Sequence, residues 1–246
     1  MRIIALGDTH GRERWKTITA KNDFDKVIFI GDYFDSRERI SLEKQKDNFK
    51  DILNFKKANM DKVILLYGNH DHHYRKTINE KYSEFQPLMK INIEELLDKT
   101  IDENLIQMCY TYKDVLFTHA GVTKTWCRAN NVDLSNIEQS INYLFKNRPT
   151  AFNFTRGANQ SNYGDDITQS PIWVRSKSLY MDKIPNYIQV VGHTTQDKIT
   201  GLNGSRKHYV PSEGIMIETS GVIFIDTLGT SGEYLQIIND KISATK

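Results

Sequence analysis

Short apolar runs alternate with a helical pattern over the first seventy residues. Residues 2–6, 26–30 and 62–67 are apolar and rich in β-branched side chains, and each run is too short for a helix. Between the second and third runs, apolar residues recur at helical spacing over 42–53, directly behind Ser41, a favourable N-cap. This strand–helix–strand order predicts parallel strands joined by right-handed crossovers.

Two further helices are expected in the middle of the chain. Asn92 and Glu95 have the spacing of a capping box, which predicts a helix that starts there and carries an apolar stripe. Ser135 and Glu138 have the same spacing and precede apolar residues at helical intervals over 137–145. We therefore expect one helix to begin at each of these pairs.

The remaining periodic segments predict strands. Apolar or alternating runs occur at 105–110, 115–118, 187–191, 215–219, 222–226 and 234–238. The first two are expected to form one hairpin, and Ser220-Gly221 is a turn signal for a second hairpin between the fourth and fifth. Together with the parallel strands, these elements predict an α/β fold.

Periodicity stops between residues 147 and 170. This segment is rich in Asn, Thr, Gln, Ser and Gly, and it directly precedes the block SPIWVR at 170–175. Structureless stretches of this length inside a compact domain are commonly binding loops, so we interpret it as a substrate-facing loop. No repeat or linker interrupts the chain, and residues 1–246 are expected to form a single domain.

Composition excludes several classes of protein. The 33 basic and 31 acidic residues leave a formal charge of +2, which indicates neither a nucleic-acid partner nor a membrane surface. No apolar run reaches the roughly 18 residues of a membrane-spanning helix, and the start of the chain lacks the pattern of a signal peptide. Cys109 and Cys127 have no CxxC spacing and are interpreted as reduced thiols of a cytoplasmic protein, whose oligomeric state the sequence leaves open.

Polar side chains capable of metal binding follow the predicted strands. Residues of this kind directly after a strand are Asp8, His10, Asp32, Asp35, Asn69, His70, His119 and His193. The carboxyl ends of parallel strands meet at one edge of a sheet, where ligands bind in open α/β folds. The mixture of carboxylate, imidazole and amide donors suits Mn, Fe, Zn, Co or Ni better than calcium or a thiolate zinc site.

Two divalent ions fit this set of side chains. Asp8 and His10 are expected to hold one ion, and Asp32 is expected to bridge it to the second. The expected ligands of the second ion are Asn69, His119 and His193. Two metals about 3.5–4 Å apart can share a hydroxide for in-line attack on a phosphoryl group. Manganese is our first expectation for both positions.

His70 is left outside this set of ligands. It is expected to protonate the leaving oxygen, while Asp35 orients its imidazole and stabilises its charge, a step typically worth roughly 10²–10⁴-fold in rate. His72, His73 and His208 are interpreted as solvated or supporting groups rather than ligands, because the preceding motif already supplies two functional side chains.

The same residues fall into five blocks that resemble a known family. In chain order the blocks are GDTHG (7–11), GDYFDSR (31–37), GNHD (68–71), THAG (118–121) and VGHT (191–194). They are similar to the five signatures of calcineurin-like metallophosphoesterases. GDYFD and the IWVR of 172–175 are most similar to the phosphoprotein phosphatase branch, in particular to its bacterial and phage-type serine/threonine phosphatases.

This resemblance implies a four-layer fold, in which a central mixed β-sandwich is flanked by helices, and a two-metal site. It also implies that Arg175 contacts the substrate phosphate through a bidentate fork. Two positions depart from the branch. Ser36 separates Asp35 from Arg37, where the branch has arginine directly after the aspartate, so either Arg37 or Arg12 is expected to take that place. Asp71 stands where the branch has glutamate.

We therefore expect a metal-dependent phosphatase that hydrolyses phosphomonoesters. Phosphoserine and phosphothreonine proteins follow from the resemblance as substrates, and small phosphoesters fit an open site. An alternative is hydrolysis of dinucleoside polyphosphates, cyclic nucleotides or nucleic-acid ends, with Phe152, Phe154 or Tyr163 as a platform for the base. A non-catalytic binding scaffold is disfavoured, because the expected ligands and His70 are all present.

Overall fold

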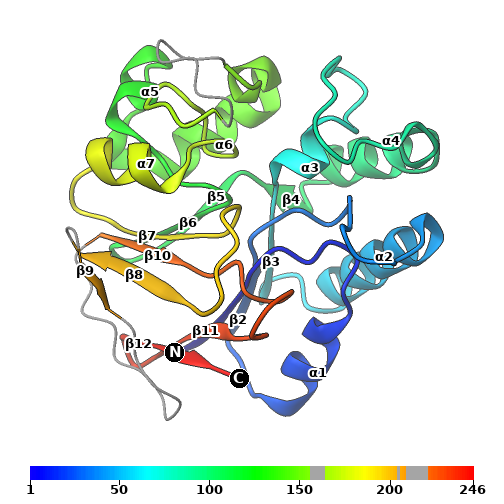
Figure 1. Cartoon of the computed structure of the whole chain (residues 1–246), viewed down its shortest axis with the longest axis horizontal. Helices are drawn as coiled ribbons and strands as arrows, with labels where there is room; N and C mark the ends of the chain where they lie inside the picture. The colour runs from blue at the N-terminus through cyan, green and yellow to red at the C-terminus, as the bar shows by residue number, and fades with distance from the viewer. Residues whose placement is uncertain (156–163, 204–205, 209–220) are drawn as a thin grey trace.

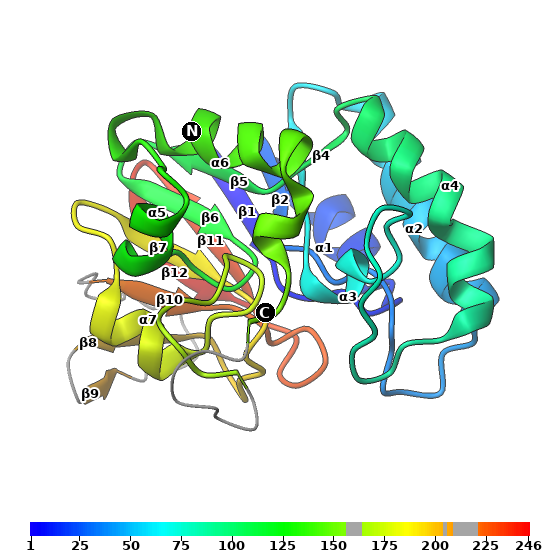
Figure 2. The same ribbon diagram turned by 90° about the horizontal axis from the view of Figure 1, so that it is seen from above.

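Two mixed β-sheets pack face to face, and helices cover their outer faces (Figures 1 and 2). The computed structural model describes residues 1–155, 164–203, 206–208 and 221–246. The expected strand at 215–219 and its turn at Ser220 lie outside the described residues. This arrangement is the helix-flanked β-sandwich that the sequence predicts.

The first sheet contains the parallel strands of the N-terminal half. Its strands are, in spatial order, β12 (Lys241–Thr245), β11 (Tyr234–Ile238), β1 (Arg2–Leu6), β2 (Lys26–Phe29), β3 (Val63–Leu66) and β4 (Ile106–Gln107). Strands β1 to β4 are parallel, and β11 and β12 extend the sheet antiparallel beyond β1. The carboxyl ends of β1, β2 and β3 therefore lie side by side.

The second sheet is built from strands that lie between residues 109 and 224. Its strands are, in spatial order, β5 (Cys109–Tyr112), β6 (Val115–Thr118), β7 (Ile188–Val191), β10 (Val222–Phe224), β8 (Thr200–Asn203) and β9 (Arg206–His208). Strands β6, β7 and β10 are parallel, whereas β5 and β8 pair antiparallel with their neighbours. The carboxyl ends of β6 and β7 are thus also adjacent.

Alternation along the strands divides their side chains between two faces. In β1, Ile3 and Ala5 pack into the core between the sheets, while Ile4 and Leu6 pack toward the helices. Phe117 and other inward residues of the second sheet complete the inner core. Because strands buried on both faces must be apolar throughout, the sequence contains short continuous apolar runs.

Helices close the outer face of each sheet. The helices are α1 (Arg14–Lys21), α2 (Leu42–Ala58), α3 (Asn69–His72), α4 (Pro87–Asp102), α5 (Lys124–Ala129), α6 (Ile137–Asn147) and α7 (Ser176–Asp182), with 3₁₀ turns η1 (Leu134–Asn136) and η2 (Pro149–Phe152). Helices α1, α2 and α4 cover the first sheet, and α5, α6 and α7 lie beyond the second (Figures 1 and 2). Among the described residues, no helix is long and apolar enough to cross a membrane.

The predicted hairpin is correct only in its second half. β5 and β6 pair antiparallel, but the first residues of the expected strand form β4, which pairs with β3 in the other sheet. The chain changes sheets at Met108, whose N–H donates to Asn142 Oδ1 at 2.8 Å. A continuous apolar run conceals this change because both sheets require buried residues there.

Two helix starts differ from the predicted capping boxes. Helix α4 begins at Pro87, and its N-cap is Gln86 rather than Asn92. Asn92 lies inside the helix, where its side-chain amide donates to the carbonyl of Leu88. Ser135 lies in η1 rather than at an N-cap, and Glu138 accepts hydrogen bonds from Thr111 instead of capping α6. The N-cap Ser41 of α2 is confirmed, since its side chain accepts the N–H of Lys44.

The strands β8, β9 and β12 were not expected from the sequence. β12, with the sequence KISAT, lies at the edge of the first sheet next to β11, so only part of it is buried. In the segment 147–170, which has no apolar periodicity, α6 ends at Asn147 and the described residues beyond it form no strand and no longer helix than the turn η2. Edge strands and short turns carry little periodic signal, because one side of each is solvated.

Candidate metal centre and active site

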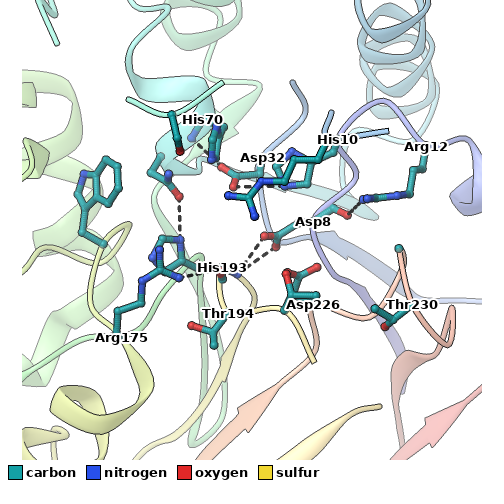
Figure 3. A pocket seen from close by; sticks show the side chains of 16 residues that line it. Asp8, His10, Arg12, Asp32, His70, Arg175, His193, Thr194, Asp226 and Thr230 are labelled. Carbon is teal, nitrogen blue, oxygen red and sulfur yellow. Dashed lines mark hydrogen bonds and ion pairs between the residues drawn. The ribbon is translucent and has the colours of Figure 1, made fainter. Parts of the chain in front are cut away.

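A cavity of about 610 Å³ opens at the carboxyl ends of the central strands. Asp8 follows β1, Asp32 follows β2, and Asn69 begins α3 directly after β3. His119 and His193 follow β6 and β7 of the other sheet. Figure 3 shows the labelled carboxylates and imidazoles gathered around the centre of this cavity. Both sheets therefore contribute to one site.

The expected metal ligands form two groups that share one carboxylate. Single ligand atoms of Asp8, His10 and Asp32 lie within 4.8 Å of one another, and the same holds for Asp32, His119 and His193. Asp32 belongs to both groups, which is the position required of a bridging ligand. The structure thus brings together the carboxylates and imidazoles that the sequence assigns to two adjacent ions.

Asn69 joins the second group through its side-chain oxygen. Asn69 Oδ1 lies 2.9 Å from His119 Nε2 and 2.8 Å from His193 Nδ1. All three side chains are almost completely buried. Three donor atoms from three separate loops therefore converge on one point, as expected of ligands to a common ion.

The orientation of two imidazoles tests whether a cation fits. His10 Nδ1 lies 2.5 Å from the carbonyl oxygen of Phe34, and His119 Nδ1 lies 3.0 Å from that of Ile30. Because a carbonyl only accepts, each Nδ1 carries the proton and each Nε2 presents a lone pair. These Nε2 atoms face Asp32 Oδ2 at 3.8 Å and 3.4 Å. Lone pairs that face a carboxylate across a buried gap fit a bound cation.

Burial raises the pKa of the carboxyl groups of the site and lowers the pKa of its imidazoles. The pKa of Asp8 is raised by burial and by the charge of Asp226, and that of Asp32 by burial and by Asp8. Burial lowers the pKa of His10 to about 3 and lowers that of His119 well below its ordinary value. A divalent ion stabilises both carboxylate anions and neutral imidazoles, so these residues fit a metal centre.

Two glycines allow the ligand-bearing loops to pass close to the carboxylates. A Cβ atom at Gly68 would lie 2.1 Å from Asp32 Oδ1, and one at Gly192 would lie 2.1 Å from Asp8 Oδ1. Asp32 itself has a φ of 53°, in the left-handed region that non-glycine residues rarely adopt. The Gly-Asp, Gly-Asn and Gly-His pairs of the sequence therefore reflect close backbone packing at the site.

Asp71 fixes two of these loops to each other. Its completely buried carboxylate accepts the backbone N–H groups of Asp32 at 3.0 Å, Tyr33 at 2.9 Å and Gly68 at 2.9 Å. These bonds hold the left-handed backbone of Asp32 against the start of α3. Sequence reasoning identified Asp71 only as a departure from the family pattern and did not predict this positioning role.

His70 and Asp35 form a hydrogen-bonded pair beside the metal ligands. His70 Nδ1 lies 2.8 Å from Asp35 Oδ2, and the backbone N–H of His70 donates to Asp32 Oδ1 at 2.8 Å. Burial alone would raise the pKa of Asp35, but the contacts with His70 and His73 outweigh it and hold that pKa below its usual value. Asp35 is therefore an anion that orients a neighbouring imidazole.

Comparison with known proteins identifies the family of the chain that carries these side chains. The family model of calcineurin-like phosphoesterases matches residues 1–199 of the 246. The chain belongs to this family. No curated protein matches the sequence. The expected family and its helix-flanked β-sandwich are thus both confirmed.

Solved structures of similar fold agree with this assignment. A metallophosphoesterase from Sphaerobacter thermophilus is 10% identical with a TM-score of 0.55, over 100% of this chain and 87% of that one. A protein serine/threonine phosphatase from Saccharomyces cerevisiae, with similarity to human phosphatase PP5, is 12% identical with a TM-score of 0.57, over 97% and 73%. At these identities the likeness concerns the fold alone.

Membership of the family and the buried ligand groups together define a metal-dependent phosphoesterase, that is, a hydrolase that binds divalent metal ions. In this calcineurin-like phosphoesterase, three arginines line the cavity. Arg175 Nη1 donates to the carbonyl of His193 at 3.2 Å, while Arg12 Nε donates to Glu38 at 2.7 Å. Arg37 lines the same cavity and is exposed. Figure 3 shows Arg175 and Arg12 on opposite sides of the carboxylates, so cationic groups flank the centre from two directions.

The expectation that His72 and His73 could be solvated is wrong. Both side chains are completely buried. His72 Nε2 lies 3.0 Å from Asn153 Oδ1, and His73 Nε2 lies 2.6 Å from Asp35 Oδ2. His73 is thus a supporting group of the site, whereas the side chain of His208 lies outside the described residues. The prediction of solvent exposure failed because the chain turns back toward Asp35 directly after α3.

The aromatic platform proposed for a nucleotide base is wrong for Phe152. This ring is completely buried and packs against Trp126 and Phe145 at centroid distances of 5.5 Å and 6.1 Å. Phe154 packs against Trp173 at 5.1 Å. Tyr163 lies outside the described residues. Phe152 therefore belongs to the hydrophobic core.

Some residues that line the cavity belong to none of the blocks identified in the sequence. They are Ser83, Thr195, Asp226, Gly229 and Thr230. Asp226 is buried and accepts the hydroxyl of Thr195 at 2.7 Å. It follows β10, so its position at the end of a parallel strand is the one signal that could have identified it. Among the described residues of 147–170, none lines the cavity.

Proposed function

We propose that this chain is a dinuclear metal-dependent phosphatase that hydrolyses phosphomonoesters of serine and threonine in proteins. The observation that carries the proposal is that two ligand groups sharing Asp32 lie directly beside the His70–Asp35 pair. Arg175, Arg37 and Arg12 border the same cavity. Metal binding, phosphate binding and proton transfer are thereby supported by one continuous set of side chains.

The ligand groups support a specific distribution of two ions. Asp8 and His10 would hold one ion, with Asp32 shared between the two. The second ion would be held by Asn69, His119 and His193. The nitrogen and oxygen donors favour manganese, with Fe, Zn, Ni or Co as other possible occupants. When bound, such ions activate water and offset the charge that develops on a transferred phosphoryl group.

His70 supplies the proton to the departing oxygen. Its Nδ1 is engaged by Asp35, and the residue lines the cavity, so Nε2 is the nitrogen available to substrate. The Asp35 carboxylate stabilises the imidazolium form and keeps the ring from rotating. A positioned general acid of this kind typically contributes roughly 10²–10⁴-fold in rate.

Arg175 and Arg37 bind the phosphate oxygens. The Arg175 guanidinium is anchored through one nitrogen to the carbonyl of His193, which orients its remaining N–H groups. A planar guanidinium can hold two phosphate oxygens at once, which fixes the phosphorus for attack in line with the leaving group. Arg37 borders the same cavity and is more exposed, so it would contact the phosphate from the solvent side.

A phosphoprotein substrate is favoured over a nucleotide by the described aromatic residues. Phe152 is part of the core, and Phe154 packs edge to face on Trp173 and does not line the cavity, so neither is placed to hold a base there. The fold shared with a yeast serine/threonine phosphatase supports the same choice.

The buried free thiols of Cys109 and Cys127 favour a reducing compartment, and we propose the cytoplasm.

Phosphate release by chelator-treated protein tests this function. Mn²⁺ is added back, and a phosphoserine peptide and a dinucleoside polyphosphate are offered at equal concentration. We expect metal-dependent release from the peptide at the higher kcat/KM. Preference for the dinucleotide would contradict the substrate class and assign the site to nucleotide hydrolysis. Absence of turnover of both compounds with Mn, Fe, Zn, Co and Ni would indicate a binding scaffold.

A further inference from the structure

Three side chains contact the carboxylate of Asp35. His70 Nδ1 lies 2.8 Å and His73 Nε2 lies 2.6 Å from the same oxygen, Oδ2. The hydroxyl of Tyr74 donates to the other oxygen, Oδ1. Asp35 is completely buried, so these three side chains replace the water that would otherwise solvate it. Two of the donors, His73 and Tyr74, have no role in the function proposed above.

Aromatic packing fixes the position of His73. Its ring stacks on Tyr82 with an interplanar angle of 19° and a centroid distance of 5.4 Å. The edges of Tyr74 and Phe85 approach it at 4.2 Å and 5.0 Å. A ring held on several sides cannot leave the carboxylate by changing rotamer, so His73 is a rigid support for Asp35.

We propose that His73 is a positioning residue for the general acid, acting through Asp35 and assisted by Tyr74. The proposal rests on the assignment of His70 as the proton donor. With Oδ1 engaged by Tyr74 and Oδ2 shared by two imidazoles, Asp35 has a single orientation. That orientation holds the proton of His70 on Nδ1 and turns Nε2 toward the leaving group.

Asp35, His70 and His73 also place ligand atoms close together. The Asp35 carboxylate, however, already contacts donors through both oxygens: Tyr74 donates to Oδ1, and the two imidazole nitrogens contact Oδ2. A carboxylate engaged in this way needs no cation to offset its charge, so we assign these residues to positioning rather than to metal binding.

Three variants of the Mn²⁺-loaded protein test the role of His73. His73→Phe keeps the packed ring but removes the donor. His73→Gln restores an N–H group close to the position of Nε2. His72→Gln is the matched control, because His72 directly precedes His73, is equally buried and contacts Asn153 rather than Asp35. Each variant is assayed with aryl phosphates whose leaving groups differ in pKa.

For His73→Phe we expect kcat to fall about 10–100-fold with the most basic leaving group, as is typical when a supporting partner is lost. The loss should shrink toward zero for acidic leaving groups, which need no proton, and KM should stay constant. His73→Gln should recover most of the activity, and His72→Gln should match the wild type. If His73→Phe does not fold, Tyr74→Phe, which retains the aromatic ring, is expected to show the same leaving-group dependence more weakly.

Three results would overturn this role. An equal loss for all leaving groups, or an equal loss in His72→Gln, would make His73 merely structural. Loss of one equivalent of bound Mn²⁺ in His73→Phe would make it a ligand. Failure of the general-acid assignment is recognised separately, since His70→Ala would then lose activity equally for every leaving group. Failure of the proposed activity would leave the wild type itself inactive.

Discussion

Asp32 and Asp35 lie three residues apart in one block, yet lone pairs surround the first carboxylate and hydrogen-bond donors surround the second. Both are buried, and both have a positive φ, 53° and 59°. Around Asp32 lie the Nε2 lone pairs of His10 and His119, and among the described residues its carboxylate accepts one hydrogen bond, from the N–H of His70. Asp35 instead receives donors on both of its oxygens. The pKa of Asp32 is raised by burial and Asp8, whereas that of Asp35 is lowered.

The two carboxylates therefore need different partners. A buried carboxylate facing lone pairs and a second carboxylate is unfavourable until a cation neutralises it. A buried carboxylate with donors on both oxygens is already stabilised and can orient a neighbour. In the function proposed above, one short block would thus supply both a metal ligand and a positioning group.

Asp32→Ala should abolish activity, with kcat falling by about 10³-fold or more, because both metal positions lose a shared ligand. Elemental analysis after dialysis should show that the variant retains less than one equivalent of Mn²⁺. A variant that keeps full metal content and full activity would remove Asp32 from the bridging position.

His70→Ala should lower kcat by roughly 10²–10⁴-fold for a phosphopeptide, whose leaving group is a poor one, and much less for an activated aryl phosphate. Metal content should be unchanged, since His70 contacts Asp35 and is not expected to bind the ions. Steady-state kinetics with both substrates checks this, and identical losses for the two would disprove proton donation.

Arg175→Ala should weaken substrate binding rather than metal binding. Loss of a charge-assisted contact with phosphate, worth about 1.5–3 kcal/mol, corresponds to a rise in KM of roughly 10–150-fold. Arg175→Lys should recover only part of this, because an ammonium cannot form the bidentate fork. Inhibition by inorganic phosphate provides an independent measure, and an unchanged inhibition constant would contradict the anchor role.

Replacing each aspartate by asparagine should change the stability of the metal-free protein in opposite directions. Asp35→Asn removes the charge that three donors stabilise and should cost about 1–3 kcal/mol in free energy of unfolding. Asp32→Asn removes a charge that burial and Asp8 disfavour, so it should be neutral or stabilising. Urea unfolding in the presence of a chelator measures both, and destabilisation of equal size would contradict the contrast.

The pH dependence of these two variants should also differ in sign. Folding raises the pKa of Asp32, so its contribution to stability is present below the pKa that it has in the unfolded chain. That contribution is lost as pH rises through the pKa that it has in the folded protein. Folding lowers the pKa of Asp35, so its contribution is present above the pKa of the unfolded chain and is lost as pH falls through the pKa of the folded protein. Relative to wild type, the free energy of unfolding of Asp32→Asn should therefore increase as pH rises from about 4 toward neutrality. The free energy of unfolding of Asp35→Asn should instead approach that of the wild type at acidic pH.

Much of the sandwich could be predicted because its central strands are buried on both faces. The runs at 2–6, 26–30 and 62–67 correspond to β1, β2 and β3 for that reason. The change of sheets at Met108 could not be predicted, since residues on either side are buried in different sheets and have the same character. The edge strand β12 was missed because only part of it is buried and its sequence, KISAT, is only weakly apolar.

The candidate metal ligands were accessible to sequence reasoning because each follows a strand within a short block. Asp71, His73 and Tyr74 were not, because their roles depend on a turn that carries them beneath the loop of Asp32 and Asp35. A histidine pair after a recognised motif gives no indication of whether it faces solvent or a carboxylate. Tertiary contacts decided that question.

The most direct test of the account is the number of Mn²⁺ ions bound per chain in wild type, Asp35→Asn and Asp32→Asn. Isothermal titration of chelator-treated protein, checked by elemental analysis, gives that number. We predict two ions for wild type, two for Asp35→Asn, which should be inactive toward phosphopeptides, and fewer than two for Asp32→Asn. Equal stoichiometry in all three proteins, or loss of an ion on replacing Asp35 alone, would contradict the division of labour between the two carboxylates.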